Sequence, residues 1–322
     1  MNDGRRKLLR VGRALVVAAV LWFVVRELVR QWRAVAGQPL GLDLHWGYLA
    51  LASAIVLATY ALLIQLWRLV LHFWGARLSL ADAIRIWCIS NLGRYVPGRV
   101  WQIGAMAALA RERGVSPVAA TGSALLNTAI NIATGMAIAL ITGREYLERL
   151  LPGGVAVATA LTVAAIVGLL ALPWMLPRVM RMAASRTGAT GIVPHVPPGA
   201  VWLTAAGNAL AWVLYGVAFQ LFVAGALGHA AGGPVPYMAV YAGSYVVGYL
   251  AIFTPGGLGV REVVMAAGLT SLGLATAPQA LLLGFASRLW LTVLEVVPGL
   301  LFLAFATGRR SRPSTSPRDV TS

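Results

Sequence analysis

The stretch GYLALASAIVLATYALLIQLWRLVL, residues 47–71, contains one charged side chain, Arg68, among 25 residues. An α-helix rises about 1.5 Å per residue, so this stretch is long enough to cross the roughly 30 Å hydrocarbon core of a bilayer. Further long apolar segments are found at 14–30, 80–112, 117–142, 154–176, 200–226, 237–275 and 278–306. The sequence therefore predicts an all-α fold, a polytopic transmembrane helical bundle.

Composition supports a membrane protein over a soluble enzyme. Of the 322 residues, 59% are hydrophobic and 11% are charged, whereas a soluble domain carries about 25% charged residues. The net charge of +16 could suggest a nucleic-acid partner. The arginines, however, lie mostly between the apolar segments, as the positive-inside rule requires of a membrane protein. We expect membrane lipids as partners and no nucleic acid.

Residues that could hold a metal are few and scattered. The chain has one cysteine, Cys88, so it cannot form an intrachain disulfide. Its four histidines have no ligand-like spacing; they are His45, His72, His195 and His229. We expect neither a metal nor a cofactor.

The distribution of charge sets the expected orientation. The N-terminus is basic, and the segment 14–30 ends without a small-residue cleavage site, so we interpret it as a retained first helix. The loops at 143–153 and 227–236 have no excess of basic residues, so we expect them on the outer side of the membrane. The loop at 177–199 and the tail after 306 are basic and fall inside. These assignments predict an inner or plasma membrane protein with both termini in the cytoplasm.

Two halves of the chain have matching organisation. Segment 47–71 corresponds to 200–226 and segment 117–142 to 278–306, with Pro-Gly breaks between them at 97 and 255. We interpret residues 1–306 as one transmembrane domain with inverted repeats, at about 47–142 and 200–306. Residues 307–322, rich in Arg, Ser and Pro, are predicted to form a disordered cytoplasmic tail.

The first break places arginines beside a Pro-Gly turn, in Arg94-Tyr-Val-Pro-Gly-Arg99. Pro97 removes a backbone donor and Gly98 permits a sharp turn. A helix that starts there would point free N–H groups into the membrane near Arg94 and Arg99, which is an arrangement suited to an anion. The alternative is that these arginines extend to the cytoplasmic headgroups.

The second break reads Thr254-Pro-Gly-Gly-Leu-Gly-Val-Arg-Glu262. Pro255, Gly256 and Gly257 would let the backbone approach a ligand closely, with Arg261 and Glu262 just inside the next helix. The alternative is tight helix packing with the charges at the interface. Paired, broken apolar segments in two halves are typical of a transporter with two re-entrant-like hairpins and a binding site near the midplane.

Other polar residues lie within the last and the central spans. Arg288 and Glu295 share a face, and either Glu262 or Glu295 could pair with an arginine or accept a proton. Asn127 lies opposite Arg288 in the repeat correspondence and one turn from Asn131, so it lines a site or bonds between helices. A tyrosine stripe at 241, 245 and 249 is interpreted as packing or an interface belt.

The motifs at 94–99 and 254–262 resemble the lysylphosphatidylglycerol synthase transmembrane region, a flippase-like family, over roughly residues 10–306. The resemblance implies lipid translocation. It also implies functional roles for the motif positions Arg94, Pro97, Gly98, Pro255, Gly256, Gly257, Arg261 and Glu262. No soluble aminoacyl-transfer domain is expected after 306, which argues against aminoacyl transfer.

The function expected is a lipid flippase or transporter for a phosphate-bearing lipid, such as a phospholipid, an aminoacylated phospholipid or a polyprenyl-phosphate carrier. The phosphate would bind Arg94, Arg99, Arg261 or Arg288. Two alternatives stay open: an integral-membrane transferase that acts on a lipid carrier, and an accessory subunit of a lipid or envelope biosynthesis enzyme. We expect no enzymatic activity, since the sequence shows no carboxylate cluster or histidine pair.

Overall fold

A computed structural model of the protein describes residues 42–95, 100–150, 152–187, 196–251 and 259–305, and also Arg26. Within these ranges the chain is helical, with no strand and a single isolated bridge between Asp43 and Leu227. The predicted all-α bundle is therefore confirmed. The predicted tail at 307–322, and the predicted first span at 14–30 apart from Arg26, lie outside the described residues.

Five helices in the described part are long and apolar enough to cross a membrane. They are α2 (Trp46–Phe73), α5 (Pro117–Thr142), α7 (Gly154–Thr187, apolar to Met175), α8 (Pro198–Leu227) and α11 (Ala277–Phe305). Four of them match the predicted segments within a few residues. Hydropathy located them well because each segment must stay predominantly apolar over about 20 residues to cross the bilayer.

Helix α7 differs from the prediction. It continues past residue 176 to Thr187, with Pro173 and Pro177 inside it, so the basic stretch that begins there starts as helix and not as loop. A proline removes one helical donor without always ending the helix. The predicted outer loop at 143–153 also contains a short helix, α6 (Arg144–Leu150).

Each predicted broken stretch is a pair of helices. The first comprises α3 (Leu80–Asn91), a 3-10 turn η1 (Leu92–Tyr95) and α4 (Val100–Arg111). The second comprises α9 (Pro234–Leu250) and α10 (Val260–Ser271). A 12-residue helix is about 18 Å long, too short to cross the hydrocarbon core. The two helices of each pair contact one another, so each stretch folds back as a hairpin and is not one kinked span.

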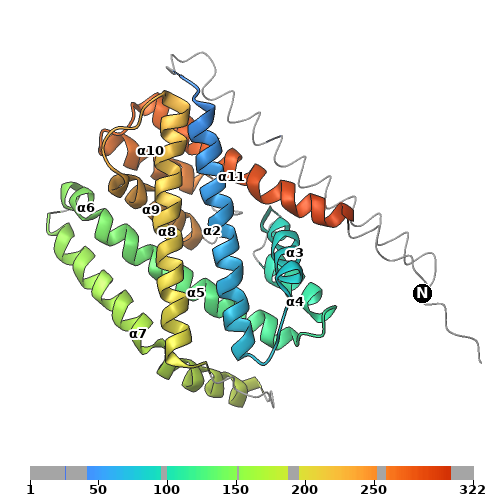
Figure 1. Ribbon diagram of the computed structural model, residues 1–322. Coiled ribbons are helices and arrows are strands. Elements are labelled where there is room, and N and C mark those ends of the chain that lie inside the picture. The colour runs from blue at the N-terminus through green and yellow to red at the C-terminus, as the bar shows by residue number, and fades with distance from the viewer. Residues whose placement is uncertain are drawn as a thin grey trace, which may run out of the picture.

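Helices α2 and α8 lie side by side at the centre (Figure 1). They run antiparallel, because Gly207 of α8 abuts Leu66 of α2 while Gly225 abuts Leu49. Small residues allow such close approach between helices in a membrane. Opposite directions are what inverted repeats require of corresponding helices. The duplication itself stays a prediction.

The two hairpins pack against opposite long helices. Helix α3 contacts α11, and α9 contacts α5. Under the predicted correspondence of the two halves, α3 matches α9 and α11 matches α5, so these two contacts are equivalent. The main buried cluster draws its residues from α2, α8, α9, α10 and α11, and includes Trp212, Phe219 and Tyr237. This packing surrounds the polar cavity described next.

Candidate functional site

A cavity of about 230 Å³ opens among the helices and is lined by both hairpins. Its ionisable side chains come from the second half: Arg261, Arg288 and Glu295. Its amide side chains come from the first half: Asn91, Gln102, Asn127 and Asn131. The remaining wall is largely aromatic, with Tyr60, Trp67, Trp87, Trp212, Tyr215, Tyr241, Tyr245 and Tyr249. Charged and amide residues thus line a partly open cavity within a membrane bundle.

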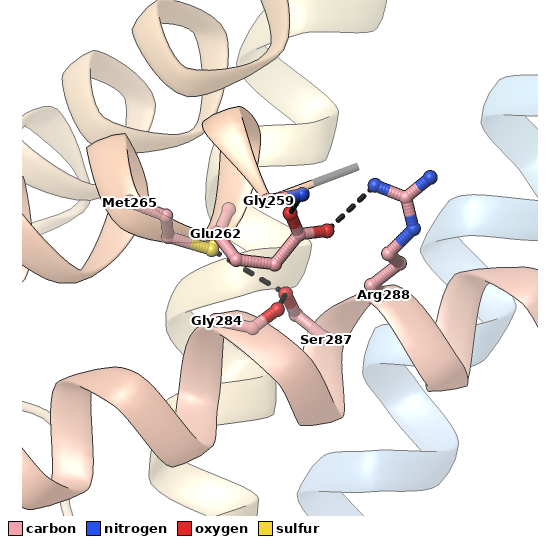
Figure 2. Close-up of polar contacts among 6 residues, drawn as sticks. All are labelled: Gly259, Glu262, Met265, Gly284, Ser287 and Arg288. Atoms are coloured by element: carbon pink, nitrogen blue, oxygen red, sulfur yellow. Dashed lines mark hydrogen bonds and ion pairs between the residues drawn. The ribbon is translucent and has the colours of Figure 1, made fainter. Parts of the chain in front are cut away.

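An ion pair joins the second hairpin to the last helix. Arg288 Nη1 of α11 donates to Glu262 Oε1 of α10 at 2.6 Å, as Figure 2 shows. Glu262 is 2% exposed, and its other oxygen accepts the Gly259 backbone N–H at 2.7 Å. Gly259 has φ +83°, a conformation that favours glycine. Of the roles that the sequence left open for Glu262 and Glu295, pairing with an arginine is observed for Glu262, and its carboxylate also caps its own helix.

Close packing of α10 on α11 supports this pair. A Cβ added at Gly284 of α11 would lie 3.1 Å from the carbonyl oxygen of Glu262. One turn on, the Ser287 hydroxyl donates to the Gly284 carbonyl at 2.9 Å (Figure 2). The absence of a side chain at Gly284 therefore allows the two backbones to approach, which brings Arg288 within reach of Glu262.

Arg261 lies against tyrosine rings of α9. Its guanidinium carbon is 5.1 Å from the ring centre of Tyr241 and 5.3 Å from that of Tyr245, within the range of cation–π attraction. Its Nη2 atom is buried and has no hydrogen-bond partner within the described ranges. A Cβ added at Gly248 of α9 would lie 3.0 Å from the Cβ of Arg261. Gly248 thus gives this arginine the room to lie along α9.

Asn91 is a second buried donor in the wall. It is the last residue of α3 and is 1% exposed. Gln102 Nε2 of α4 donates to its Oδ1 at 2.6 Å, while its Nδ2 has no partner in the part of the chain that the structure describes. Neither Asn91 nor Gln102 was predicted as a site residue. Amide side chains next to an interruption between two helices form no sequence pattern that would identify them as site residues.

Asn127 lies in the cavity wall and also bonds between helices. Asn208 Nδ2 of α8 donates to its Oδ1 at 3.5 Å, and Asn131 Nδ2 donates to Asn208 Oδ1 at 2.8 Å. Asn208 is fully buried. The interhelical hydrogen bonding that the sequence left open is therefore present, and two of these asparagines, Asn127 and Asn131, also line the cavity.

Glu295 lies on the same helix as Arg288 and lines the cavity. The hydroxyl of Tyr60, on α2, donates to Glu295 Oε1 at 3.3 Å. Tyr60 also stacks at an angle against Trp87 of α3, with ring centres 5.1 Å apart. Glu295 thus belongs to a polar and aromatic wall that connects the first half of the chain to the second.

The tyrosine stripe packs into the bundle, as predicted, and also lines the cavity. Tyr241, Tyr245 and Tyr249 of α9 line the cavity, and two of them contact the Arg261 guanidinium. The predicted packing role is confirmed for Tyr241, which is 3% exposed and lies against the rings of Trp212 and Tyr215; the contact with Arg261 was not predicted. An i, i+4 spacing shows that side chains share a helix face, but it does not tell what that face contacts.

Five predicted residues come together at one site. Asn127, Arg261, Arg288 and Glu295 line the cavity, and Glu262 forms an ion pair with Arg288. Other predicted positions lie outside the described residues. They are Pro97, Gly98, Arg99, Pro255, Gly256 and Gly257, and the side chain of Arg94, whose backbone belongs to η1. Among the described residues, no three His, Cys, Asp or Glu side chains gather as a metal site would.

Five apolar helices and two helical hairpins around a polar cavity define a multi-pass integral membrane protein. Residues 10–299 match the family described as the lysylphosphatidylglycerol synthase TM region, and the chain belongs to this family. The resemblance recognised in the two broken motifs is therefore confirmed. A comparison with curated proteins found no match.

Proposed function

We propose that the protein moves a phosphate-bearing lipid, or another lipid-linked anion, across the membrane. The observation that carries this proposal is Arg261. Arg261 lines a cavity within the bundle, and its Nη2 atom is buried without a hydrogen-bond partner among the described residues. An ionisable side chain inside a membrane protein is costly and usually marks the path of an ion or substrate.

The electrostatics of the cavity favour an anion at Arg261. Glu262, the neighbouring carboxylate, is bound to Arg288 and to the backbone of Gly259. Within the described ranges no ion pair involves Arg261, which packs instead on tyrosine rings. A guanidinium presents donors that match the oxygens of a phosphate. The phosphate therefore binds the Arg261 side chain in preference to the end of α10, where Glu262 already accepts the Gly259 N–H.

The proposed route keeps the acyl chains in lipid while the headgroup crosses through the cavity. The motif positions Arg94 and Arg99 are further arginines, in the sequence of the first broken stretch, that the proposal assigns to the phosphate. The Arg288–Glu262 pair offers a second cation that a phosphate can reach by displacing the carboxylate. The membrane is the inner or plasma membrane, with both termini in the cytoplasm.

The proposal is tested by reconstituting the protein in liposomes with lipids that carry a fluorescent acyl chain and an unmodified headgroup. A quencher that cannot cross the membrane then reports which leaflet holds the probe. The panel contains phosphatidylglycerol, an aminoacylated phosphatidylglycerol, a polyprenyl phosphate and diacylglycerol, which has no phosphate. We expect faster movement of at least one phosphate lipid and no acceleration of diacylglycerol. Equal rates with and without folded protein across the panel would contradict the proposal.

A further inference from the structure

We propose that the protein couples lipid movement to protons, with the Glu295 carboxylate of α11 as the group that takes up and releases the proton. This inference rests on the proposed function and adds the energy source that drives movement through the same cavity. One proton enters the cavity from the water on one side together with the anionic lipid. It leaves to the water on the other side when the lipid is released, so no further reactant is required.

Glu295 lies where a carboxylate is costly to a membrane protein. It belongs to the apolar span α11, is partly buried, and lines the cavity that Arg261 also lines. Acidic residues are rare within transmembrane segments, and those present commonly face a polar cavity, pair with a cation or relay protons. The position of Glu295 therefore gives it access to the proposed substrate path from the middle of a span.

The two carboxylates of the site are held in different ways. Glu262 is 2% exposed, pairs with Arg288 at 2.6 Å and accepts the Gly259 N–H at 2.7 Å. These donors stabilise its ionised form. Glu295 accepts a longer hydrogen bond, 3.3 Å, from the neutral hydroxyl of Tyr60. A hydroxyl can donate to a carboxylate and accept from a protonated carboxyl. Glu295 is therefore the better suited of the two to change its protonation.

A wall of tyrosine rings joins Glu295 to the anion site at Arg261. The Tyr60 and Tyr215 ring centres are 6.3 Å apart, and Tyr215 stacks on Tyr241 at 5.4 Å. Tyr241 lies in turn against the Arg261 guanidinium, whose carbon is 5.1 Å from the ring centre. Both Arg261 and Glu295 act electrostatically on the Tyr241 phenol. The two charges therefore belong to one electrostatic environment.

An anion at Arg261 adds negative charge to the cavity that Glu295 lines. Like charges disfavour each other's ionised form, and they do so more strongly where little water screens them, so the anion favours a protonated Glu295. By linkage, a protonated Glu295 favours the anion by the same factor. Other fixed charges do not change the sign of this effect, because they are present with and without the anion. Lipid and proton are therefore expected to enter together.

The other titratable groups around Glu295 are mainly phenols, a thiol and guanidinium groups. At neutral pH phenols and thiols ordinarily keep their protons and guanidinium groups stay charged. The groups are Tyr60 of α2, Cys88 of α3, Tyr215 of α8, Tyr241, Tyr245 and Tyr249 of α9, Arg261 and Glu262 of α10, and Arg288 of α11 itself. The side chain of Arg94, in η1, lies outside the described residues. Among the described groups, the proton is therefore assigned to a carboxylate, and Glu262 is already held by its ion pair.

The test adds a pH difference to the liposome assay of lipid movement, with the fluorescent probe introduced into the outer leaflet. Phosphatidylglycerol, aminoacylated phosphatidylglycerol and the polyprenyl phosphate are each measured with the outside about one pH unit more acidic than the inside. Coupling to one proton predicts that wild type concentrates the transported lipid in the inner leaflet, by up to about tenfold for a singly charged lipid. Without a pH difference the probe should reach both leaflets equally.

Three variants assign the proton to its group. Glu295→Gln resembles the protonated side chain, so it should still move lipid but should not concentrate it in response to the pH difference. Glu145→Gln is the matched control: it removes an exposed carboxylate on α6 outside this cavity and should behave as wild type. Tyr60→Phe removes a hydroxyl that stabilises the ionised Glu295, so the pH of half-maximal lipid movement should rise.

The wild-type measurement tests the coupling even if Glu295→Gln does not fold. Wild-type movement that leaves the probe evenly distributed despite the pH difference overturns the coupling and leaves the transport function intact. Accumulation that follows a potassium diffusion potential and ignores the pH difference does the same, because voltage drives an anion that crosses alone. A folded Glu295→Gln that still concentrates lipid overturns the assignment of the proton to Glu295. Failure of the proposed function has a different signature, in which no lipid of the panel moves under any pH difference, and it removes this inference as well.

Discussion

Arg288 and Glu262 form a 2.6 Å ion pair between α11 and α10, and the same carboxylate accepts the N–H of Gly259 at the start of α10. One side chain thus fixes the end of a hairpin helix and also holds an arginine at the cavity wall. Glu262 is 2% exposed, whereas the Arg288 side chain is 16% exposed. The pair therefore links the folding of the second hairpin to the electrostatics of the cavity.

The first prediction concerns this pair. Glu262→Gln should destabilise the protein by about 3 kcal/mol, because removing one partner leaves the buried charge of the other uncompensated. Arg288→Gln should have a similar effect. The double variant should be less destabilised than the sum of the single variants, since neither charge is then left alone. Unfolding in detergent measures all three, and strictly additive effects would contradict a direct pair.

The second prediction concerns Gly248. Gly248→Leu should displace Arg261, because even a Cβ at this position would lie 3.0 Å from the Cβ of Arg261. Overpacking of this kind costs about 1–3 kcal/mol, and lipid movement should fall along with stability. Gly243→Ala on the same helix is the control: the nearest atom to its Cβ would be 3.9 Å away. The Gly243→Ala variant should retain full activity. An inactive Gly243→Ala with an active Gly248→Leu would refute the claim that Gly248 gives Arg261 the room it needs.

The third prediction concerns orientation. Glu112 follows α4 and Glu145 belongs to α6, and both are exposed. In a Cys88→Ala background, Glu145→Cys should react with a maleimide that cannot cross the membrane when it is added to intact cells. Glu112→Cys should react only after the cells are opened. Labelling of both positions from outside would contradict the expected layout, with its cytoplasmic basic loops.

The sequence was sufficient to locate the long helices, because crossing a bilayer requires about 20 consecutive, predominantly apolar residues. It also indicated that Glu262 or Glu295 could pair with an arginine or accept a proton, and the structure shows the pairing for Glu262. It did not predict that α7 would continue beyond Pro173 and Pro177. Proline lowers the stability of a helix, but it does not determine where the helix ends when the surrounding structure supports it.

The candidate site was predicted only in part. Arg261 and Arg288 were found because charges are rare in apolar segments, so each one needs an explanation. Asn91 and Gln102 were missed because their bond joins two arms of a hairpin, and such a tertiary contact has no local sequence pattern. The tyrosine stripe was recognised as packing, but its contact with Arg261 was not predicted, since the spacing shows a shared helix face and not the identity of the neighbour.

The fourth prediction tests the central claim most directly, by measuring leaflet-resolved lipid movement in proteoliposomes for wild type, Arg261→Gln, Arg261→Lys and Arg178→Gln. Arg178 is exposed on α7 and bonds to the Trp174 carbonyl, so it controls for the loss of an arginine elsewhere. The account predicts that wild type and Arg178→Gln move a phosphate lipid, that Arg261→Gln is at least tenfold slower, and that Arg261→Lys is intermediate because lysine retains the charge without the planar donors. Full activity of a folded Arg261→Gln would contradict the claim that the substrate phosphate binds this arginine.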